Sequence, residues 1–247
     1  WSSDVCSSDL YRGSGGNWDE NVVEKECEGC NSQDAWSIDV GDYNADGLLD
    51  VLIGGQMDMV LTPFANSGDG NWTQQDDGII MGRASTLQGY FVDINRDGFL
   101  DLIANLRDGV WVYLGDGNGG WTDSSAGLPV ESGTNESPFS LDWGDFNNDG
   151  FVDLALCTVD NGDSHLYAFS GDGGGGWTDN SVGLPNQAYV TVKLADMNQD
   201  KYDDIVGVTP NGVVETYLAT ETGGWVKSQN TLQGNARDRK SVGRERV

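Results

Sequence analysis

The chain has 247 residues, with 40 acidic and 13 basic side chains and a formal net charge of −27. Nucleic acid and anionic membrane surfaces would repel so acidic a protein, so we expect neither as a partner. No apolar run approaches the ~20 residues that cross a bilayer, so we expect no membrane insertion.

The two ends of the chain share no pattern with the interior. Residues 1–10 are serine-rich, and residues 237–247 hold five of the 13 basic residues. We expect both segments to be non-native or disordered and leave them out of the fold reasoning. The interior, residues 11–236, holds 35 of the 36 glycines and is treated as one domain.

An acidic stretch in this interior recurs four times. VGDYNADGLLDVLIGG (40–55) is followed by FVDINRDGFLDLIANL (91–106), WGDFNNDGFVDLALCT (143–158) and LADMNQDKYDDIVGVT (194–209). The cores occupy residues 42–50, 93–101, 145–153 and 196–204, and their first aspartates lie 51, 52 and 51 residues apart. So constant a period indicates a repeat architecture.

A glycine-rich turn ending in tryptophan falls between the copies. It ends at Trp18, Trp72, Trp121, Trp177 and Trp225, so a partial unit precedes the first complete one. Within a unit, short apolar runs such as residues 99–106 and 151–158 are typical of buried strands. A unit of ~51 residues holds four strands of about five residues, as a β-propeller blade does. We therefore predict an all-β fold, a β-propeller of four-stranded blades.

The acidic D-x-N-x-D-G-x-x-D cores resemble those of FG-GAP/VCBS repeats, which form the N-terminal propeller of integrin α-subunits and many secreted bacterial proteins. The resemblance covers about residues 11 to 235. It implies an extracellular, secreted or cell-surface protein. Propellers of this family usually have seven blades, whereas four to five are present here, so we expect further blades outside this chain.

The acidic turns are candidate calcium sites, because calcium takes six to eight oxygen ligands and alternate residues of a tight loop can face one ion. We expect side-chain ligands at positions 1, 3, 5 and 9 of each core and a backbone carbonyl at position 7. The candidates are Asp42, Asn44, Asp46, Leu48 and Asp50; Asp93, Asn95, Asp97, Phe99 and Asp101; Asp145, Asn147, Asp149, Phe151 and Asp153; and Asp196, Asn198, Asp200, Tyr202 and Asp204.

The fourth core has Lys201 where the other three have glycine at position 6. Lysine resists a positive φ and adds a cation beside the site, so we expect the fourth site to be the weakest. An EF-hand is excluded, since it needs a bidentate glutamate at position 12, and the four copies have Ile53, Ala104, Leu156 and Gly207 there.

Two alternatives to calcium are open. The aspartates could form metal-free Asx-turns that cap their own backbone. Magnesium is the less favoured ion, since it tolerates less crowding. We expect about four calcium ions in a structural role, because in the families that this chain resembles calcium braces the propeller and does no chemistry.

Three further signals are weak. The stretches GDGNGG (115–120) and GDGGGG (171–176) match a dinucleotide fingerprint, but neither opens a helix, so we interpret them as turns. His165 is the single histidine and is expected at a strand end. Cys27 and Cys30 form either a small loop disulfide or free thiols, and Cys157 is expected to be buried.

We predict a non-catalytic extracellular module that binds a protein or glycan ligand through its propeller loops, with no catalytic residues. Trp36, Tyr90 and Trp143 could stack on sugars, although packing is the simpler role. The alternative is a calcium-dependent polysaccharide-cleaving or other hydrolytic propeller. It would need a constellation that breaks the repeat symmetry, and the mid-chain arginines suggest no common site.

Overall fold

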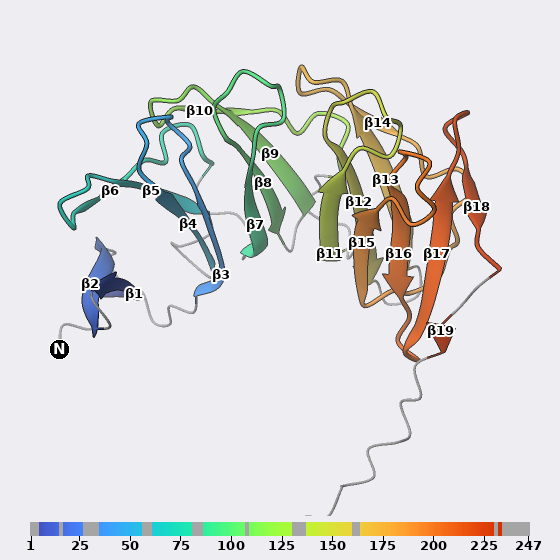
Figure 1. Ribbon diagram of the computed structural model, residues 1–247, viewed down its shortest axis with the longest axis horizontal. Helices are drawn as coiled ribbons and strands as arrows, with labels where there is room; N and C mark the ends of the chain where they lie inside the picture. The colour runs from blue at the N-terminus through green and yellow to red at the C-terminus, as the bar shows by residue number, and fades with distance from the viewer. Residues whose placement is uncertain are drawn as a thin grey trace, which may run out of the picture.

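The computed structural model describes residues 5–14, 17–26, 35–55, 61–80, 86–106, 109–129, 137–159, 164–229 and 232–233. Every element in this part of the chain is a β-strand. The strands form four antiparallel sheets, each a simple meander, and one separate hairpin (Figure 1). The predicted all-β fold with four-stranded repeating units is confirmed.

Each sheet corresponds to one predicted blade, and its strands follow chain order from the innermost to the outermost. The four sheets are stacked along an open arc, as Figure 1 shows. Blade 1 holds β3 (Ala35–Gly41), β4 (Asp50–Gly55), β5 (Thr62–Asn66) and β6 (Trp72–Gln74); blade 2 holds β7 (Thr86–Val92), β8 (Asp101–Leu106), β9 (Gly109–Gly115) and β10 (Trp121–Asp123); blade 3 holds β11 (Ser137–Gly144), β12 (Asp153–Val159), β13 (Leu166–Gly171) and β14 (Trp177–Asp179); blade 4 holds β15 (Thr191–Ala195), β16 (Asp204–Val208), β17 (Val213–Ala219) and β18 (Trp225–Lys227).

Two further elements lie outside these meanders. β19 (Leu232–Gln233) pairs with the start of β17, and β1 (Val5–Ser14) pairs with β2 (Asn17–Glu26) as a hairpin. β1 extends across residue 10, where we expected the boundary between the terminal segment and the repeat array. That residues 1–10 are non-native or disordered stays a prediction. Residues 237–247 lie outside the described residues.

The apolar second strand of blade 2 is buried between the sheets of blades 1 and 3, and that of blade 1 is equally buried. All six residues of β4 and of β8 are buried. Alternate residues of these strands enter different cores: Leu102 packs between blades 1 and 2, and Ile103 packs between blades 2 and 3. Such two-sided burial explains why the sequence shows continuous apolar runs here rather than alternation.

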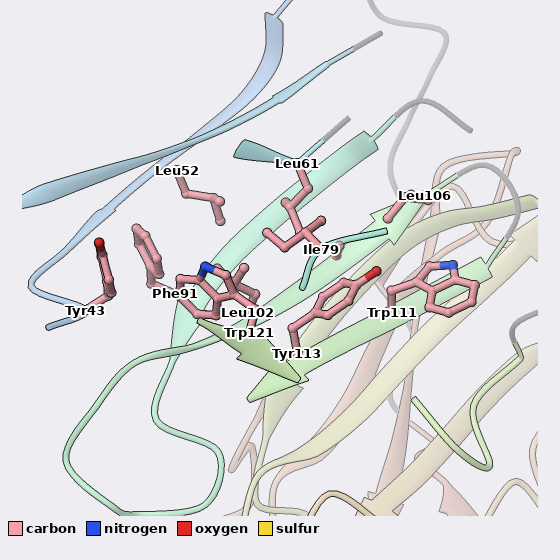
Figure 2. Close-up of a cluster of buried hydrophobic side chains, with 11 residues drawn as sticks. Tyr43, Leu52, Leu61, Ile79, Phe91, Leu102, Leu106, Trp111, Tyr113 and Trp121 are labelled. Carbon is pink, nitrogen blue, oxygen red and sulfur yellow. The ribbon is translucent and has the colours of Figure 1, made fainter. Parts of the chain in front are cut away.

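Three hydrophobic cores join consecutive blades. The core between blades 1 and 2 is rich in aromatic side chains (Figure 2). In it, Tyr43 lies 5.9 Å from Phe91 and 5.4 Å from Trp121 between ring centroids. Aromatic pairs at this separation add to the stabilisation from area burial.

The inner strands of neighbouring blades are tied together by side chains that accept backbone hydrogen bonds. Asp39 accepts from the N–H of Phe91 and Asp142 from the N–H of Leu194, both at 2.8 Å. These residues are 52 positions apart in sequence. The packing of neighbouring blades therefore depends on polar residues of the innermost strand as well as on the apolar cores.

The Gly-Trp turns also connect consecutive blades. Trp121 donates its indole N–H to the carbonyl oxygen of Gln75 at 2.7 Å, and Trp177 donates to Ser124 at 3.0 Å. Trp225 donates to Asn180 at 2.9 Å. In each case the acceptor follows the tryptophan of the preceding blade by three residues, so the repeated motif is an inter-blade contact. The described residues contain no helix that is long and apolar enough to span a membrane.

Candidate metal centre

The four predicted loops join the first strand of each blade to the second and fold in the same way. In blade 3, Asp145 accepts hydrogen bonds from the backbone of Asp149 and Gly150 at 3.1 and 2.9 Å. Asn147 accepts from Asp149 at 2.9 Å, and Asp149 accepts from Phe151 at 2.8 Å. The side chains at positions 1, 3 and 5 thus gather inside one tight turn. The pattern recurs, with small differences, at Asp42, Asn44 and Asp46, at Asp93, Asn95 and Asp97, and at Asp196, Asn198 and Asp200.

The backbone of these loops enters the left-handed region at position 6. Gly47, Gly98 and Gly150 have φ of 88°, 92° and 88°, and Lys201 is held at 79°. Glycine takes this conformation without steric cost, whereas a side chain is strained there. The expected conflict at Lys201 is therefore present in the fourth loop, which keeps its shape at the cost of backbone strain.

The aspartates at position 9 have a second role that the sequence did not predict. Asp101 is completely buried and accepts the backbone N–H of Ile94 and of Gly115, both at 2.8 Å. Its two oxygens therefore clamp the start of the acidic loop to the end of the third strand. Asp50, Asp153 and Asp204 are equally buried and make the corresponding pair of bonds to Tyr43 and Asn66, to Phe146 and Gly171, and to Met197 and Ala219.

Burial opposes the charge on these clamping carboxylates. It raises the pKa of Asp153 to about 7 and that of Asp101 to about 6, although the backbone hydrogen bonds act in the opposite direction. The neighbouring acidic side chains raise the two pKa values further. A cation close to the loop would favour the ionised form of both residues.

The residues present fit a hard cation by their chemistry. All the side-chain donors at positions 1, 3 and 5 are oxygens, as calcium prefers. In the second loop, Oδ1 of Asp93 is buried and has no hydrogen-bond partner. A buried, unpaired carboxylate oxygen is costly unless an ion or a water satisfies it.

Metal coordination by acidic side chains alone is not seen. Across the described ranges, no three His, Cys, Asp or Glu side chains come together in an arrangement that could hold a metal ion. A cation in these loops would therefore need the asparagine oxygen at position 3, a backbone carbonyl or water besides the carboxylates. The carbonyls of Leu48, Phe99, Phe151 and Tyr202 stay the predicted ligands at position 7.

A second group of polar and aromatic side chains follows the inner strands. Asp39, Tyr90, Asp142 and Lys193 stand at equivalent positions of blades 1 to 4, three residues before each loop's first aspartate. Nζ of Lys193 lies 2.7 Å from Oδ1 of Asp142. Burial raises the pKa of Tyr90 to about 12, and the charges of Asp142 and Asp39 act in the same direction.

Two tryptophans flank this inner-strand row. Trp36 on β3 and Trp143 on β11 are 39% and 40% exposed, and Tyr90 on β7 is partly buried. Packing therefore covers more than half of the surface of each tryptophan residue, and the rest is accessible to solvent. These three aromatic residues, singled out in the sequence, lie on the first strands of blades 1 to 3.

Sequence reasoning missed a polar cluster in blade 4. Oε2 of Glu215 accepts hydrogen bonds from the hydroxyl groups of Tyr189 and Tyr217 at 2.7 and 2.9 Å and from Gln187 at 2.7 Å. Its Oε1 lies 2.6 Å from Nζ of Lys227. The strand register aligns Glu215 with Thr62, Trp111 and Tyr167 of the other blades. An acidic residue at a repeat position where the other three blades have none was the sequence feature that could have indicated this cluster.

The weak sequence signals are explained by the fold. The stretches 115–120 and 171–176 are the turns between the third and fourth strands of blades 2 and 3, where Asp116 and Asp172 accept the turn's own amides. His165 directly precedes β13, as expected. Cys157 is buried and free, and burial raises its pKa to about 11. Cys27 and Cys30 lie outside the described residues.

Comparison with known proteins agrees with this architecture. A family model described as FG-GAP-like repeat matches residues 42–104, 93–156 and 145–207, which together span two thirds of the chain. No curated protein sequence matches the chain.

Solved structures with a similar fold include three proteins of low sequence identity. One is BBS1N in complex with ARL6DN (TM-score 0.53, 10% identity, 83% of this chain and 58% of that chain). The second is Saccharomyces cerevisiae Sqt1 (0.59, 14%, 94% and 57%), and the third is an Agrocybe aegerita lectin that recognises non-reducing terminal N-acetylglucosamine (0.53, 14%, 95% and 68%). This chain thus spans less than two thirds of the first two structures.

Proposed function

Since the chain belongs to the family of FG-GAP-like repeat proteins, we propose that it is a calcium-braced part of a β-propeller that acts as a non-catalytic recognition or adhesion module. Its ligand would be an extracellular protein or a carbohydrate. The protein would accordingly be secreted or exposed on a cell surface, with further blades beyond the four described here.

The calcium component of the proposal is supported by the four acidic loops. Each loop gathers two carboxylates and an amide oxygen within one turn, and the unpaired Oδ1 of Asp93 needs a partner. An ion bound there would offset the mutual repulsion of the carboxylates. It would also fix the loop that precedes each buried second strand. Its role would be structural, because the loops offer no group that acts on a substrate.

The recognition component depends on the inner-strand row and its two flanking tryptophans. At this repeat position the four blades differ in charge, with an acid, a phenol, an acid and an amine in turn. Partly exposed aromatic rings beside hydrogen-bonding groups are suited to sugar rings, whose apolar faces stack and whose hydroxyls bind carboxylates. The partial exposure of Trp143 next to this row is the observation that carries the proposal.

The hydrolytic alternative finds less support in this row. Lys193 and Asp142 form an ion pair, and the carboxylate of Asp142 also accepts the N–H of Leu194. The carboxylate of Glu215 is likewise engaged by four side chains. Groups that are held in this way are less available for proton transfer to a substrate.

A glycan array followed by titration of intrinsic tryptophan fluorescence tests the proposal. We expect the calcium-loaded protein to retain specific glycans and Trp143→Ala to weaken their binding at least tenfold. Val182→Ala, at a residue that is 87% exposed and lies between β14 and β15 rather than on an innermost strand, is the control and should bind normally. A polysaccharide-depolymerisation assay is run in parallel, and cleavage of a bound glycan would favour the hydrolytic alternative.

A further inference from the structure

The third and fourth acidic loops, residues 145–153 and 196–204, are joined by a pair of hydrogen bonds. The backbone N–H of Asp145 donates to Oδ2 of Asp203 at 2.9 Å, and the backbone N–H of Asp203 donates to the carbonyl oxygen of Asp145 at 3.1 Å. We call this pair of bonds the loop lock. Through it, Asp203 holds the residue at position 1 of the third loop, whose side chain is the first candidate ligand there.

An acid at the place of Asp203 breaks the repeat. Position 8 of the other three loops is occupied by Leu49, Leu100 and Val152, whose side chains cannot accept a hydrogen bond. Leu100 and Val152 pack against the cores between blades. The first and second loops are joined by a longer backbone bond, from Leu100 to the carbonyl oxygen of Tyr43 at 3.4 Å. Within the described residues, a side chain of one acidic loop accepts a backbone N–H of the neighbouring loop only at the loop lock.

Gly144 gives the carboxylate of Asp203 its space. A Cβ at Gly144 would lie 2.4 Å from Oδ2 of Asp203, so any larger residue would displace the carboxylate. At the equivalent Gly41, a Cβ would lie 2.5 Å from Cδ1 of Leu100. Both glycines make room for position 8 of the following loop, but only Asp203 uses this room for a hydrogen bond to the backbone.

No cation accounts for the acid at position 203. In the part of the chain that the structure describes, the ion pairs are Lys193–Asp142 and Lys227–Glu215, so no basic side chain pairs with Asp203. Asp203 is partly buried, and a carboxylate at a repeat position that is otherwise apolar is costly unless it is hydrogen-bonded. The bond from Asp145 is the interaction that offsets this cost.

Asp203 also stands between two candidate ligands of its own loop. Tyr202 before it offers the carbonyl at position 7, and Asp204 after it is the completely buried aspartate at position 9. An interaction that orders Tyr202 and Asp204 therefore also fixes Asp203, and Asp203 in turn fixes the backbone of Asp145. The two loops share this ordering, so an ion that binds second meets a loop that is already ordered in part.

We propose that Asp203 is a positioning residue that ties the third loop to the fourth, so that the two loops bind calcium with positive cooperativity. The inference rests on the calcium component of the proposed function, although the loop lock is present without an ion. Because coupling between two sites is reciprocal, each loop strengthens calcium binding by the other by the same factor. The third loop thereby offsets part of the strain at Lys201, whose φ is 79°.

The sign of the coupling distinguishes the loop lock from plain electrostatics. Two cations in neighbouring loops repel each other, so repulsion alone predicts that each weakens the binding of the other. The loop lock predicts the opposite. The second and third loops are an internal comparison: the guanidinium carbon of Arg96 lies 5.4 Å from the ring centroid of Phe151. This contact leaves the backbone of Asp145 untouched, so we expect no positive coupling between those two loops.

Hydrogen exchange of the Asp145 amide in the calcium-free protein tests the loop lock itself. Asp203→Leu introduces the residue type of the first two loops and removes the acceptor, so exchange should become about tenfold faster or more. Asp203→Asn keeps an acceptor oxygen and should leave the rate within about threefold of the original. Equal exchange rates in Asp203→Leu and in the original chain would overturn the proposal.

Calcium titrations followed by NMR test the cooperativity, since the amides of Gly150 and Lys201 report the third and fourth loops separately. Asp200→Ala disables the fourth loop by removing its candidate ligand at position 5. In the original chain this change should weaken calcium binding to the third loop about fivefold or more. In the Asp203→Leu background it should have no effect on the third loop, whereas the Asp203→Asn background should keep the coupling.

Two glycine substitutions form a matched pair. Gly144→Ala displaces the carboxylate of Asp203 without replacing it and should abolish the coupling. It also takes the place of Asp203→Leu in both measurements if that variant does not fold. Gly41→Ala crowds Leu100 in the same way and is the control, which should keep the coupling between the third and fourth loops.

The outcomes separate this inference from the proposed function. If calcium binds but Asp200→Ala leaves or strengthens binding to the third loop, the inference is wrong and the calcium component of the proposed function stands. Equal loss of coupling in Asp203→Leu and Asp203→Asn would assign the effect to charge rather than to the hydrogen bond, and would also overturn the inference. No calcium binding at either amide of the original chain would overturn the calcium component, and the cooperativity with it.

Discussion

Asp153 accepts a hydrogen bond from the backbone N–H of Gly171 at 3.1 Å, although the two residues are 18 positions apart. The other carboxylate oxygen of Asp153 accepts from Phe146 at 2.9 Å. The last aspartate of the acidic motif, on the second strand, therefore ties the start of its own loop to the end of the third strand through the backbone, whether or not an ion is bound nearby.

The first prediction separates this clamp from a metal ligand. Asp153→Ala leaves two buried N–H groups without an acceptor, so we expect a loss of about 2–4 kcal/mol in the free energy of unfolding. Asp149→Ala alters an exposed side chain of the same loop and should cost much less without calcium. Urea unfolding with and without calcium measures both. A calcium-independent effect of Asp149→Ala as large as that of Asp153→Ala would contradict the distinction.

The second prediction concerns calcium itself. Removal of bound ions by a chelator should lower the Tm by about 5 °C or more, since an ion that binds only the folded state at 100 times its Kd adds about 2.7 kcal/mol. Excess calcium should restore the Tm, and magnesium should restore less of it. Differential scanning calorimetry is the measurement, and an unchanged melt after thorough chelation would refute the calcium sites.

The third prediction concerns the strained residue of the fourth loop. Lys201→Gly should increase the free energy of unfolding by about 1 kcal/mol, because glycine accepts the φ of 79° without strain. It should also bring the calcium affinity of this loop closer to that of the other three. The measurements are urea unfolding and calcium titration.

The matched control for Lys201→Gly is the reverse change in the second loop. Gly98 has a φ of 92°, and a Cβ placed there would meet nothing within 4 Å. Gly98→Lys therefore tests the backbone strain without a steric clash and should destabilise the protein by a similar amount. If neither substitution changes stability, strain at this position is not the reason for the glycine.

The fourth prediction concerns the cluster around Glu215. Burial opposes ionisation of Glu215, but hydrogen bonds from Lys227, Tyr189 and Tyr217 outweigh it and lower its pKa to about 2. Since this pKa is depressed, the stabilisation is present above the ordinary value of 4.5 and is lost as the pH falls from there toward 2. Glu215→Gln should remove this part of the pH dependence of the free energy of unfolding. Urea unfolding curves of both proteins at several pH values from 6 to 2 measure it. Parallel curves for the two proteins would exclude the contribution.

Much of the fold could be predicted from the sequence because the information is local and repeated. Each strand is short, and each acidic loop and Gly-Trp turn is formed by residues close in sequence. The loop conformation at Gly47, Gly98 and Gly150 follows from residue type, and so does the strain at Lys201. Four copies of the same pattern then fix the number and order of the blades.

The tertiary structure decided what the repeated residues do between blades. The acceptor of an indole N–H, such as Gln75 for Trp121, lies 46 residues away on another sheet, and no local pattern specifies it. The same holds for the clamp at Asp153 and for the network at Glu215, where burial and distant partners determine the roles of the side chains. The sequence by itself determined the β-propeller blades and their oxygen-rich turns. Only the packing between blades showed that the indole N–H groups of the Gly-Trp turns join one blade to the next.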